Sequence, residues 1–160
     1  MRFGLLGDLR IVDDAGSERT VPAAKQRILL AALLLDANRT VSRDALIDAL
    51  WDSTPPPNAG AALRTYLARL RHALGDTQGR IIAKPSGFLL ELREATELDV
   101  TEVEHYSGTA AAAARDSRWD RASQALRAAE GLWRGTPPAE RERIARGLCC
   151  PGPHEFPPEF

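Results

Sequence analysis

The residues best suited to binding chemistry lie in one segment, Asn58 to Leu74, with the sequence NAGAALRTYLARLRHAL. Read as an α-helix, it places leucines at 4-3-4 spacing on one narrow stripe and basic, small and polar residues on the other side. The leucines are Leu63, Leu67, Leu70 and Leu74. The opposite side carries Arg64, Thr65, Ala68, Arg69, Arg71 and His72. No acidic residue occurs from Ser53 to Gly75, so no nearby carboxylate neutralises the arginines.

Such a helix suits the major groove of DNA. Arginine can pair there with guanine, and alanine and threonine leave room for base edges and thymine methyl groups. The alternative is an ordinary surface helix with solvated arginines, because a basic cluster alone is weak evidence of nucleic-acid binding. The neighbouring elements therefore have to decide between the two interpretations.

The charge of the chain is distributed unevenly. The 160 residues carry a formal net charge of −1, but residues 53–90 hold five basic side chains and a single acid, Asp76. Residues 91–104 reverse the balance, with six acids against Arg93. This asymmetry indicates a basic module beside an acidic one, so the overall charge does not exclude DNA binding.

The first part of the chain predicts a small antiparallel sheet followed by a core helix. Short β-prone runs alternate with turn signals, which predicts strands over residues 3–6, 9–12 and 19–21. Pro22 suits the first position of a helix, where its missing N–H needs no partner. Residues 28–35 are apolar, which is typical of a helix at the centre of a core. The polar side chains of its first turns are expected to be solvated: Lys25, Gln26 and Arg27.

A second, shorter helix is predicted from Arg43 to Trp51, with Ser42 as its N-cap. Three prolines in residues 52–57 form a stiff loop that cannot continue this helix. Asn58 is suited to cap the basic helix that follows, and Gly75 is suited to end it.

Residues 80–92 read as a β-hairpin with a turn at Pro85-Ser86-Gly87 and with Lys84 beside the tip. The order of elements is then sheet, helix, helix, loop, helix and hairpin, which is that of a winged helix-turn-helix. In this arrangement the N-terminus of the second helix can hold a phosphate. The basic helix enters the major groove, and the hairpin tip offers a cation to the DNA backbone. The neighbouring elements thus favour DNA binding.

The sequence changes character after Glu97. Two Ala-rich helices are predicted, over residues 98–117 and 118–133, and together they are similar to one helical-hairpin repeat of the tetratricopeptide type. One face of the second helix is available for packing: Trp119, Ala122, Leu126, Ala129 and Trp133. A single pair cannot bury such a face alone, because repeats of this kind need neighbours. Residues 139–146 could begin another helix, and the Pro-rich residues 149–160 are expected to be disordered.

Nothing in the sequence indicates an enzyme. His72, His105 and His154 lie far apart, and no Gly-rich phosphate loop is present. The adjacent Cys149 and Cys150 lack the usual spacing of metal ligands, so neither a metal site nor a cofactor is expected.

Two further observations concern charge and location. The acidic run from Glu91 to Glu104 is expected to be a solvated face rather than a cation site. The longest apolar stretch is too short to cross a bilayer, and the N-terminus lacks the features of a signal peptide. A cytoplasmic protein without membrane contact is expected.

Several segments resemble the Streptomyces antibiotic regulatory proteins, the AfsR/SARP group of transcriptional activators. The segments are AKQRILLAALLLDANRTVSRDALIDALW, PPPNAGAALRTYLARLRHALG, IIAKPSGFLLEL, ELDVTEVE and the helical pair ending in EGLWRG. The resemblance implies an OmpR-type winged helix followed by a helical bacterial transcriptional activation domain. It also implies binding of direct repeats near promoters of antibiotic biosynthesis genes, recruitment of RNA polymerase, and a possible homodimer on DNA.

The resemblance assigns roles to individual residues. Arg69-Leu70-Arg71 matches the Arg-Leu-Arg of the OmpR-type recognition helix, and Lys84 matches the basic residue of the wing. Ser42 and Arg43 match the phosphate-facing start of the preceding helix. We expect base contacts from Arg64, Thr65, Arg69 and His72, space for bases at Ala68, and phosphate contacts from Arg43, Arg71 and Lys84. The loop implied to contact polymerase comprises Trp51, Asp52, Ser53, Thr54, Pro55, Pro56 and Pro57.

The expected fold class is mainly α with small antiparallel β. The expected domains are a winged helix over residues 1–95, a partial activation domain over residues 96–148 and a tail over residues 149–160. Two departures from the family are visible: Phe88 stands where a tyrosine commonly follows the wing glycine, and the second domain is short. Two alternatives therefore stay open, namely a helical protein-interaction module and a DNA-binding competitor that does not activate.

Overall fold

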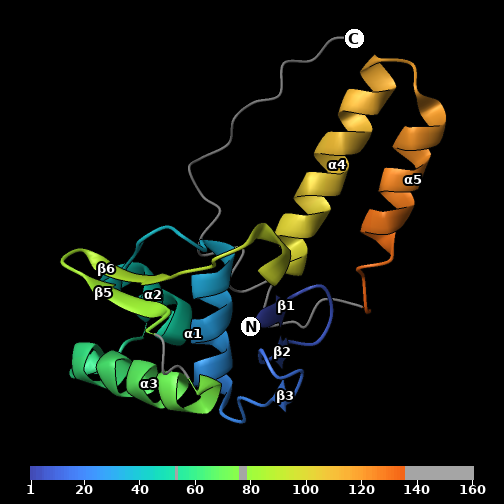
Figure 1. Cartoon of the computed structure of the whole chain (residues 1–160). Coiled ribbons are helices and arrows are strands. Elements are labelled where there is room, and N and C mark those ends of the chain that lie inside the picture. Colours follow the sequence, from blue (N-terminus) through green and yellow to red (C-terminus); the bar gives the residue numbers. More distant parts are fainter. Residues whose placement is uncertain (53, 76–78, 136–160) are drawn as a thin grey trace, which may run out of the picture.

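The computed structural model describes residues 1–52, 54–75 and 79–135. Its architecture is mainly helical with two small antiparallel sheets, in agreement with the predicted fold class (Figure 1). The strands are β1 Arg2–Gly4, β2 Arg10–Val12, β3 Glu18–Arg19, β4 Val41–Ser42, β5 Ile81–Lys84 and β6 Gly87–Leu90. The helices are α1 Ala24–Leu35, α2 Arg43–Trp51, α3 Ala59–Leu74, α4 Asp99–Arg115 and α5 Trp119–Glu130, with a 3₁₀ turn, η1, at Ala95–Glu97.

The N-terminal sheet has the order β1-β2-β3, and Phe3 of β1 lies opposite Ile11 of β2. Its first strand ends at Gly4, earlier than the sequence predicts. The reason is that the next two backbone N–H groups, of Leu5 and Leu6, donate to the carboxylate of Asp99. These two residues therefore leave the strand to contact a side chain that lies far along the chain.

Helix α1 lies at the centre of the core, as its apolar sequence predicts. Its residues Leu29, Leu30 and Leu33 are completely buried, and α2, α3 and β6 pack against the helix. The prediction that Pro22 occupies the first helical position is wrong. The first turn closes on the carbonyl of Ala23, so the helix starts two residues after the proline.

Helices α2 and α3 begin and end where the sequence predicts. The Ser42 hydroxyl accepts a hydrogen bond from the N–H of Ala45 (3.1 Å), which confirms the N-cap of α2. Gly75 ends α3 in the left-handed conformation (φ 61°). Asn58 has the N-cap position of α3, but its side chain caps nothing, which corrects that prediction. All four leucines of the predicted stripe are buried in the core: Leu63, Leu67, Leu70 and Leu74.

The hairpin forms with a tighter turn than expected, because Gly87 belongs to β6 and pairs with Lys84. A short strand that the sequence did not indicate, β4, completes this sheet in the order β4-β6-β5. Gly87 permits the approach of β4, since a Cβ atom built there would lie 1.9 Å from the carbonyl oxygen of Val41.

Replacing Gly87 by alanine is expected to lower the free energy of unfolding by about 1–3 kcal/mol, the usual cost of forcing a methyl group into packed structure. Chemical denaturation measures the change. Gly108 is the control: it lies in α4 with nothing within 4 Å of a Cβ, so Gly108→Ala should stabilise by about 0.5–1 kcal/mol. Equal stability of Gly87→Ala and wild type would contradict the close packing of β4 against the hairpin.

Helices α4 and α5 form an antiparallel pair that projects away from α1, α2 and α3 (Figure 1). Their interface consists of small residues: Ala110 and Ala113 of α4, with Ala122, Ala125 and Ala129 of α5. The predicted packing face is wrong in part, because Trp119, Leu126 and Trp133 are 65%, 51% and 50% exposed. Alanines let the two helices approach closely, so Trp119 and Leu126 are left on a neighbouring stripe of α5, whereas Trp133 lies beyond the end of the helix.

Candidate nucleic-acid interface

The outer face of α3 carries the exposed residues that the sequence assigns to base contacts. They are Arg64, Thr65, Ala68, Arg69 and His72, and all lie opposite the buried leucines. Within the part of the chain that the structure describes, no hydrogen bond or ion pair involves the side chains of Arg64, Arg69 or His72. These cationic and polar groups are therefore free to meet an anionic partner.

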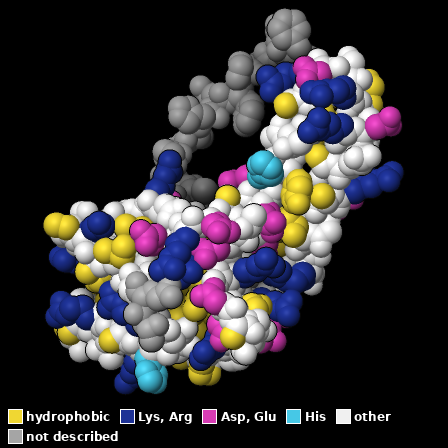
Figure 2. Space-filling view, in the orientation of Figure 1, with side chains coloured by type: hydrophobic (Ala, Val, Ile, Leu, Met, Phe, Trp, Pro, Cys, Tyr) yellow, Lys and Arg dark blue, Asp and Glu magenta, His cyan; other side chains and the backbone are white. Residues whose placement is uncertain are grey.

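Basic side chains gather over the region formed by α3 and the hairpin (Figure 2). Lys84 is exposed at the end of β5, directly before the two-residue turn. Phe88, which departs from the family pattern, is buried and lies opposite Val41, so its ring serves the core of the hairpin. The structure thus combines a basic helix face and a basic hairpin tip on one side of the molecule.

Arg71 differs from the other arginines of α3. It is half-buried, and its guanidinium donates to the carbonyl oxygen of Ile81 in β5 from Nε (3.2 Å) and from Nη2 (2.8 Å). The sequence pattern grouped it with the exposed face. In the structure Arg71 points toward the hairpin instead and joins α3 to β5.

Ser42 and Arg43 lie at the start of α2, and both are exposed. Because Ser42 also pairs with Gly87, which lies opposite Lys84, the N-terminus of α2 lies beside the tip of the hairpin. The Ser42 oxygen accepts the capping bond, which leaves its O–H able to donate to a phosphate, whereas Asp44 adds a negative charge in the same turn. A phosphate contact at this end of α2 would therefore combine the Ser42 O–H with the charge of Arg43.

Trp51 anchors the α2–α3 loop, although the sequence analysis assigned it to the surface that contacts polymerase. Trp51 is half-buried, its ring lies 6.0 Å from that of Tyr66, and the Lys25 ammonium lies 5.3 Å from the indole centroid. Lys25 also donates to the Leu50 carbonyl at the end of α2, so the prediction that it is solvated is wrong. The signal that was missed is the helix C-terminus, which attracts a cation.

The remaining residues of this loop are mostly accessible. Asp52, Thr54, Pro55 and Pro57 are exposed and Pro56 is half-buried, whereas Ser53 lies outside the described residues. The Thr54 N–H and hydroxyl both donate to the Trp51 carbonyl (3.2 Å each), which fixes the start of the loop. The other polar residues of the first turns of α1 also differ from expectation: Gln26 is buried and Arg27 donates to the Pro22 carbonyl.

The acidic run is not a solvated face throughout, which corrects that prediction. Glu97 accepts two hydrogen bonds from the buried Arg80 (2.8 Å each) and one from the N–H of Arg93 (2.7 Å). Burial raises the pKa of Glu97, but these hydrogen bonds and the Arg80 charge outweigh burial and lower the pKa to about 2. The N-terminal amino group, 3.5 Å away, contributes in the same direction.

Stability is expected to depend on the ionisation of Glu97. Its pKa is lowered on folding from its usual 4.5, so the stabilisation is complete above pH 4.5 and is lost as the pH falls toward 2. Glu97→Gln should therefore cost about 2 kcal/mol at pH 7, after allowance for solvent screening. The difference from wild type should shrink below pH 4.5 in denaturant titrations. A constant difference from pH 7 to 3, or an equal effect of the exposed Glu94→Gln, would contradict this role.

Asp99 is the second buried acid of the run. Its carboxylate accepts from the N–H groups of Leu5 (2.8 and 2.9 Å) and Leu6 (2.9 Å), and from Arg134 Nη2 (2.9 Å). The Arg134 N–H in turn donates to the Leu6 carbonyl (2.8 Å). A Cβ atom on Gly4 would lie 2.0 Å from the Arg134 guanidinium, so glycine leaves room for it. The start of α4 and the segment after α5 are thus both joined to the N-terminal sheet.

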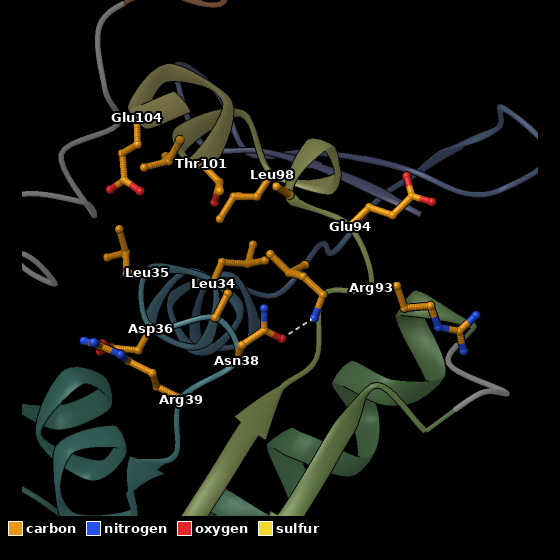
Figure 3. Close-up of a pocket in the computed structure, with 14 residues that line it drawn as sticks. Leu34, Leu35, Asp36, Asn38, Arg39, Arg93, Glu94, Leu98, Thr101 and Glu104 are labelled. Atoms are coloured by element: carbon orange, nitrogen blue, oxygen red, sulfur yellow. Dashed lines mark hydrogen bonds between the residues drawn. The ribbon is translucent and has the colours of Figure 1, made fainter. Parts of the chain in front are cut away.

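A hollow of about 530 Å³ lies between the end of α1, the segment after β6 and the start of α4 (Figure 3). Leu34 and Leu98 contribute apolar surface to the hollow, and both acidic and arginine side chains line its rim. The Asn38 side chain accepts from the N–H of Leu92 (2.8 Å) beside it. Because its charges are mixed, the hollow does not select an anion or a cation.

Within residues 1–52, 54–75 and 79–135, no group of three or more His, Cys, Asp or Glu side chains could hold a metal ion. In the same residues, no helix combines the length and the apolar character that a membrane span needs. The predictions for residues 136–160, including the Cys149 and Cys150 pair, lie outside the described residues.

A family model described as "Transcriptional regulatory protein, C terminal" matches residues 17–88, from β3 into β6. Transcriptional regulatory protein EmbR of Mycobacterium tuberculosis is 40% identical over 138 residues, covering 83% of this chain and 35% of that protein. Regulatory protein AfsR of Streptomyces coelicolor is 35% identical over 92% of the chain and 15% of its own length. Regulatory protein DnrI of Streptomyces peucetius is 31% identical over 84% of the chain and 52% of its own length.

A solved structure of M. tuberculosis EmbR, in complex with a low-affinity phosphopeptide, is similar in fold, with a TM-score of 0.77 at 36% identity. The match covers 84% of this chain and 36% of that chain. The present chain therefore spans between about a seventh and about half of the length of these relatives.

Proposed function

The chain belongs to the AfsR/SARP family of DNA-binding transcriptional regulators, and we propose that it activates secondary-metabolite genes by binding direct repeats and recruiting RNA polymerase. The observation that supports this proposal most strongly is the outer face of α3. Its exposed arginines have no partner among the described residues, and the basic hairpin lies beside them.

The proposed division of work follows from the exposed groups. Arg64, Thr65, Arg69 and His72 address base edges in the major groove, and Ala68 leaves space for the bases. Arg43 and Lys84 contact phosphates on either side, which fixes the orientation of α3 but carries no sequence information. The hairpin acts as the wing.

Direct repeats imply a particular assembly. Two copies bound to direct repeats are related by translation along the DNA and not by a two-fold axis, so any contact between them is head-to-tail. The proposed polymerase surface is the exposed part of the α2–α3 loop, namely Asp52, Thr54, Pro55 and Pro57. Trp51, at the start of the loop, holds this surface in place through its contacts with Tyr66 and Lys25.

A second candidate function rests on exposed apolar side chains of α5 and the segment after it. Trp119 and Leu126 lie seven residues apart on α5, and Trp133 follows the end of the helix. Exposed apolar patches of this kind mark protein contacts. On this alternative the helical pair binds a protein, and the chain either does not read DNA or competes with activating relatives for their sites.

DNA selection from a random library, followed by a mobility-shift titration, separates these functions. The wild-type chain should enrich one duplex, called here the selected duplex, over a scrambled duplex of equal length. Its affinity should fall steeply between 50 and 200 mM salt, because neutralised phosphates release counterions. A folded chain that enriches no duplex would contradict the proposal and favour the interaction module. Enrichment without activation of a promoter carrying the selected duplex would favour the competitor.

A further inference from the structure

The hairpin presents a backbone carbonyl to α3. Strand β5 is the outer strand of the sheet β4-β6-β5. The Arg80 carbonyl, just before this strand, accepts from the N–H of Glu91 (2.8 Å) and so points toward the β6 side. Because successive carbonyls along a strand point in opposite directions, the Ile81 carbonyl points away from β6. It is this carbonyl that receives the two N–H groups of Arg71.

The Arg71 contact is suited to hold two elements in a fixed geometry. A guanidinium is planar, so two of its N–H groups bound to one oxygen restrict both the position and the direction of the side chain. A hydrogen bond from a charged donor is also stronger than one between neutral groups. Arg71 is half-buried between α3 and β5, whereas Arg64 and Arg69 on the same helix are exposed.

The contact also determines where Lys84 lies. Lys84 is three residues beyond Ile81 in the same strand, a distance of about 10 Å at roughly 3.3 Å per residue. The strand is paired with β6 along its whole length, from Ile81 opposite Leu90 to Lys84 opposite Gly87. Because the paired strands move together, a contact that fixes Ile81 also restricts the position of the hairpin tip.

We propose that Arg71 is a positioning residue, which holds the wing against α3 so that Lys84 reaches a phosphate while the α3 face reads the bases. The inference rests on the proposed DNA-binding function and deepens it. It gives Arg71 a role between the two DNA-binding elements, in place of the direct phosphate contact that the sequence pattern implies.

A double-mutant cycle tests this role, with Arg71→Met, Lys84→Ala and the double variant. Methionine keeps most of the side-chain length but has no N–H group. Affinity for the selected duplex is measured at several salt concentrations, and thermal unfolding verifies that each variant is folded. We expect Lys84→Ala to weaken binding several-fold and to reduce the slope of log affinity against log salt by about 0.9, the value for one phosphate contact.

If Arg71 positions the wing, Arg71→Met should reproduce the loss seen in Lys84→Ala, and the double variant should be no worse than either single variant. Arg71→Lys should recover part of the Lys84 contribution, because its ammonium can still donate to the carbonyl. Additive effects, with a total slope change of about 1.8, would overturn the inference and indicate a direct phosphate contact at Arg71.

Arg64 supplies the matched control. It lies on the same helix, is exposed and has no partner among the described residues, so Arg64→Met and Lys84→Ala should combine additively. Non-additivity in this cycle as well would overturn a specific role for Arg71. Failure of the wild type to enrich any duplex is a different result: it removes the proposed function, and the inference with it.

Discussion

Replacing Arg69 by alanine is expected to weaken binding to the selected duplex by about 1–3 kcal/mol, or roughly 5- to 150-fold, if its guanidinium pairs with a guanine. The side chain is exposed at the middle of the α3 face and is free of other partners in the described part of the chain. Binding to the scrambled duplex should change much less, because sequence-independent affinity comes from phosphate contacts. Mobility-shift titrations on the two duplexes measure the difference.

Arg127 is the control for Arg69. It is an exposed helical arginine like Arg69, but it lies on α5, away from the proposed interface. Arg127→Ala should bind both duplexes as the wild type does. If Arg69→Ala lost affinity for both duplexes equally, Arg69 would be a phosphate contact, and the proposed orientation of α3 would be wrong.

Replacing Asp99 by alanine is expected to lower the free energy of unfolding by about 3 kcal/mol, the cost of breaking a buried, paired charge. The substitution removes the acceptor for the Leu5 and Leu6 N–H groups and for Arg134. Because these bonds join the start of α4 and the segment after α5 to the N-terminal sheet, the helical pair should also separate from that sheet. Urea denaturation gives the first quantity, and amide hydrogen exchange at Leu5 and Leu6 gives the second.

Asp120 provides the matched control, since it is also an acid in the first turn of a helix but is exposed. Asp120→Ala removes only a favourable interaction with the helix dipole and should cost about 0.3–1 kcal/mol. If the two substitutions had equal effects, the three-way contact at Asp99 would contribute nothing beyond that dipole interaction.

The elements that the sequence predicted well are those whose signals are local. The leucine spacing of α3, the Ser42 cap and the Gly75 stop each depend on residues within a few turns, and the structure confirms all three. The exposed face of α3 follows directly from the same spacing, which is why most of the candidate interface could be named before the fold was known.

The features that the sequence did not predict depend on contacts between distant segments. Asp99 and Leu5 are 94 residues apart, and nothing local distinguishes Asp99 from the other acids of the run. Arg71 has the same periodicity as a groove-facing residue, but the packing of the hairpin turns it toward Ile81. Strand β4 is two residues long, too short for any pattern, and exists because Gly87 admits it.

The exposed apolar side chains of α5 are a third case. Trp119 and Leu126 are large apolar residues of the kind that usually marks a packing face, and periodicity alone selects them. Trp133 continues the same spacing but lies beyond the end of the helix. The smaller alanines form the actual interface, since they permit closer approach of α4 and α5. Which of two adjacent stripes is buried depends on the partner helix, and this choice is not encoded in α5 itself.

Protection of guanine N7 atoms against methylation tests the central claim most directly, because this atom lies in the major groove. On the selected duplex, the wild-type chain should protect one or more guanines within each repeat, and Arg69→Ala should restore reactivity at one of them. Specific binding that leaves every guanine N7 reactive, on a duplex with guanines inside the protected site, would show that α3 does not read the major groove.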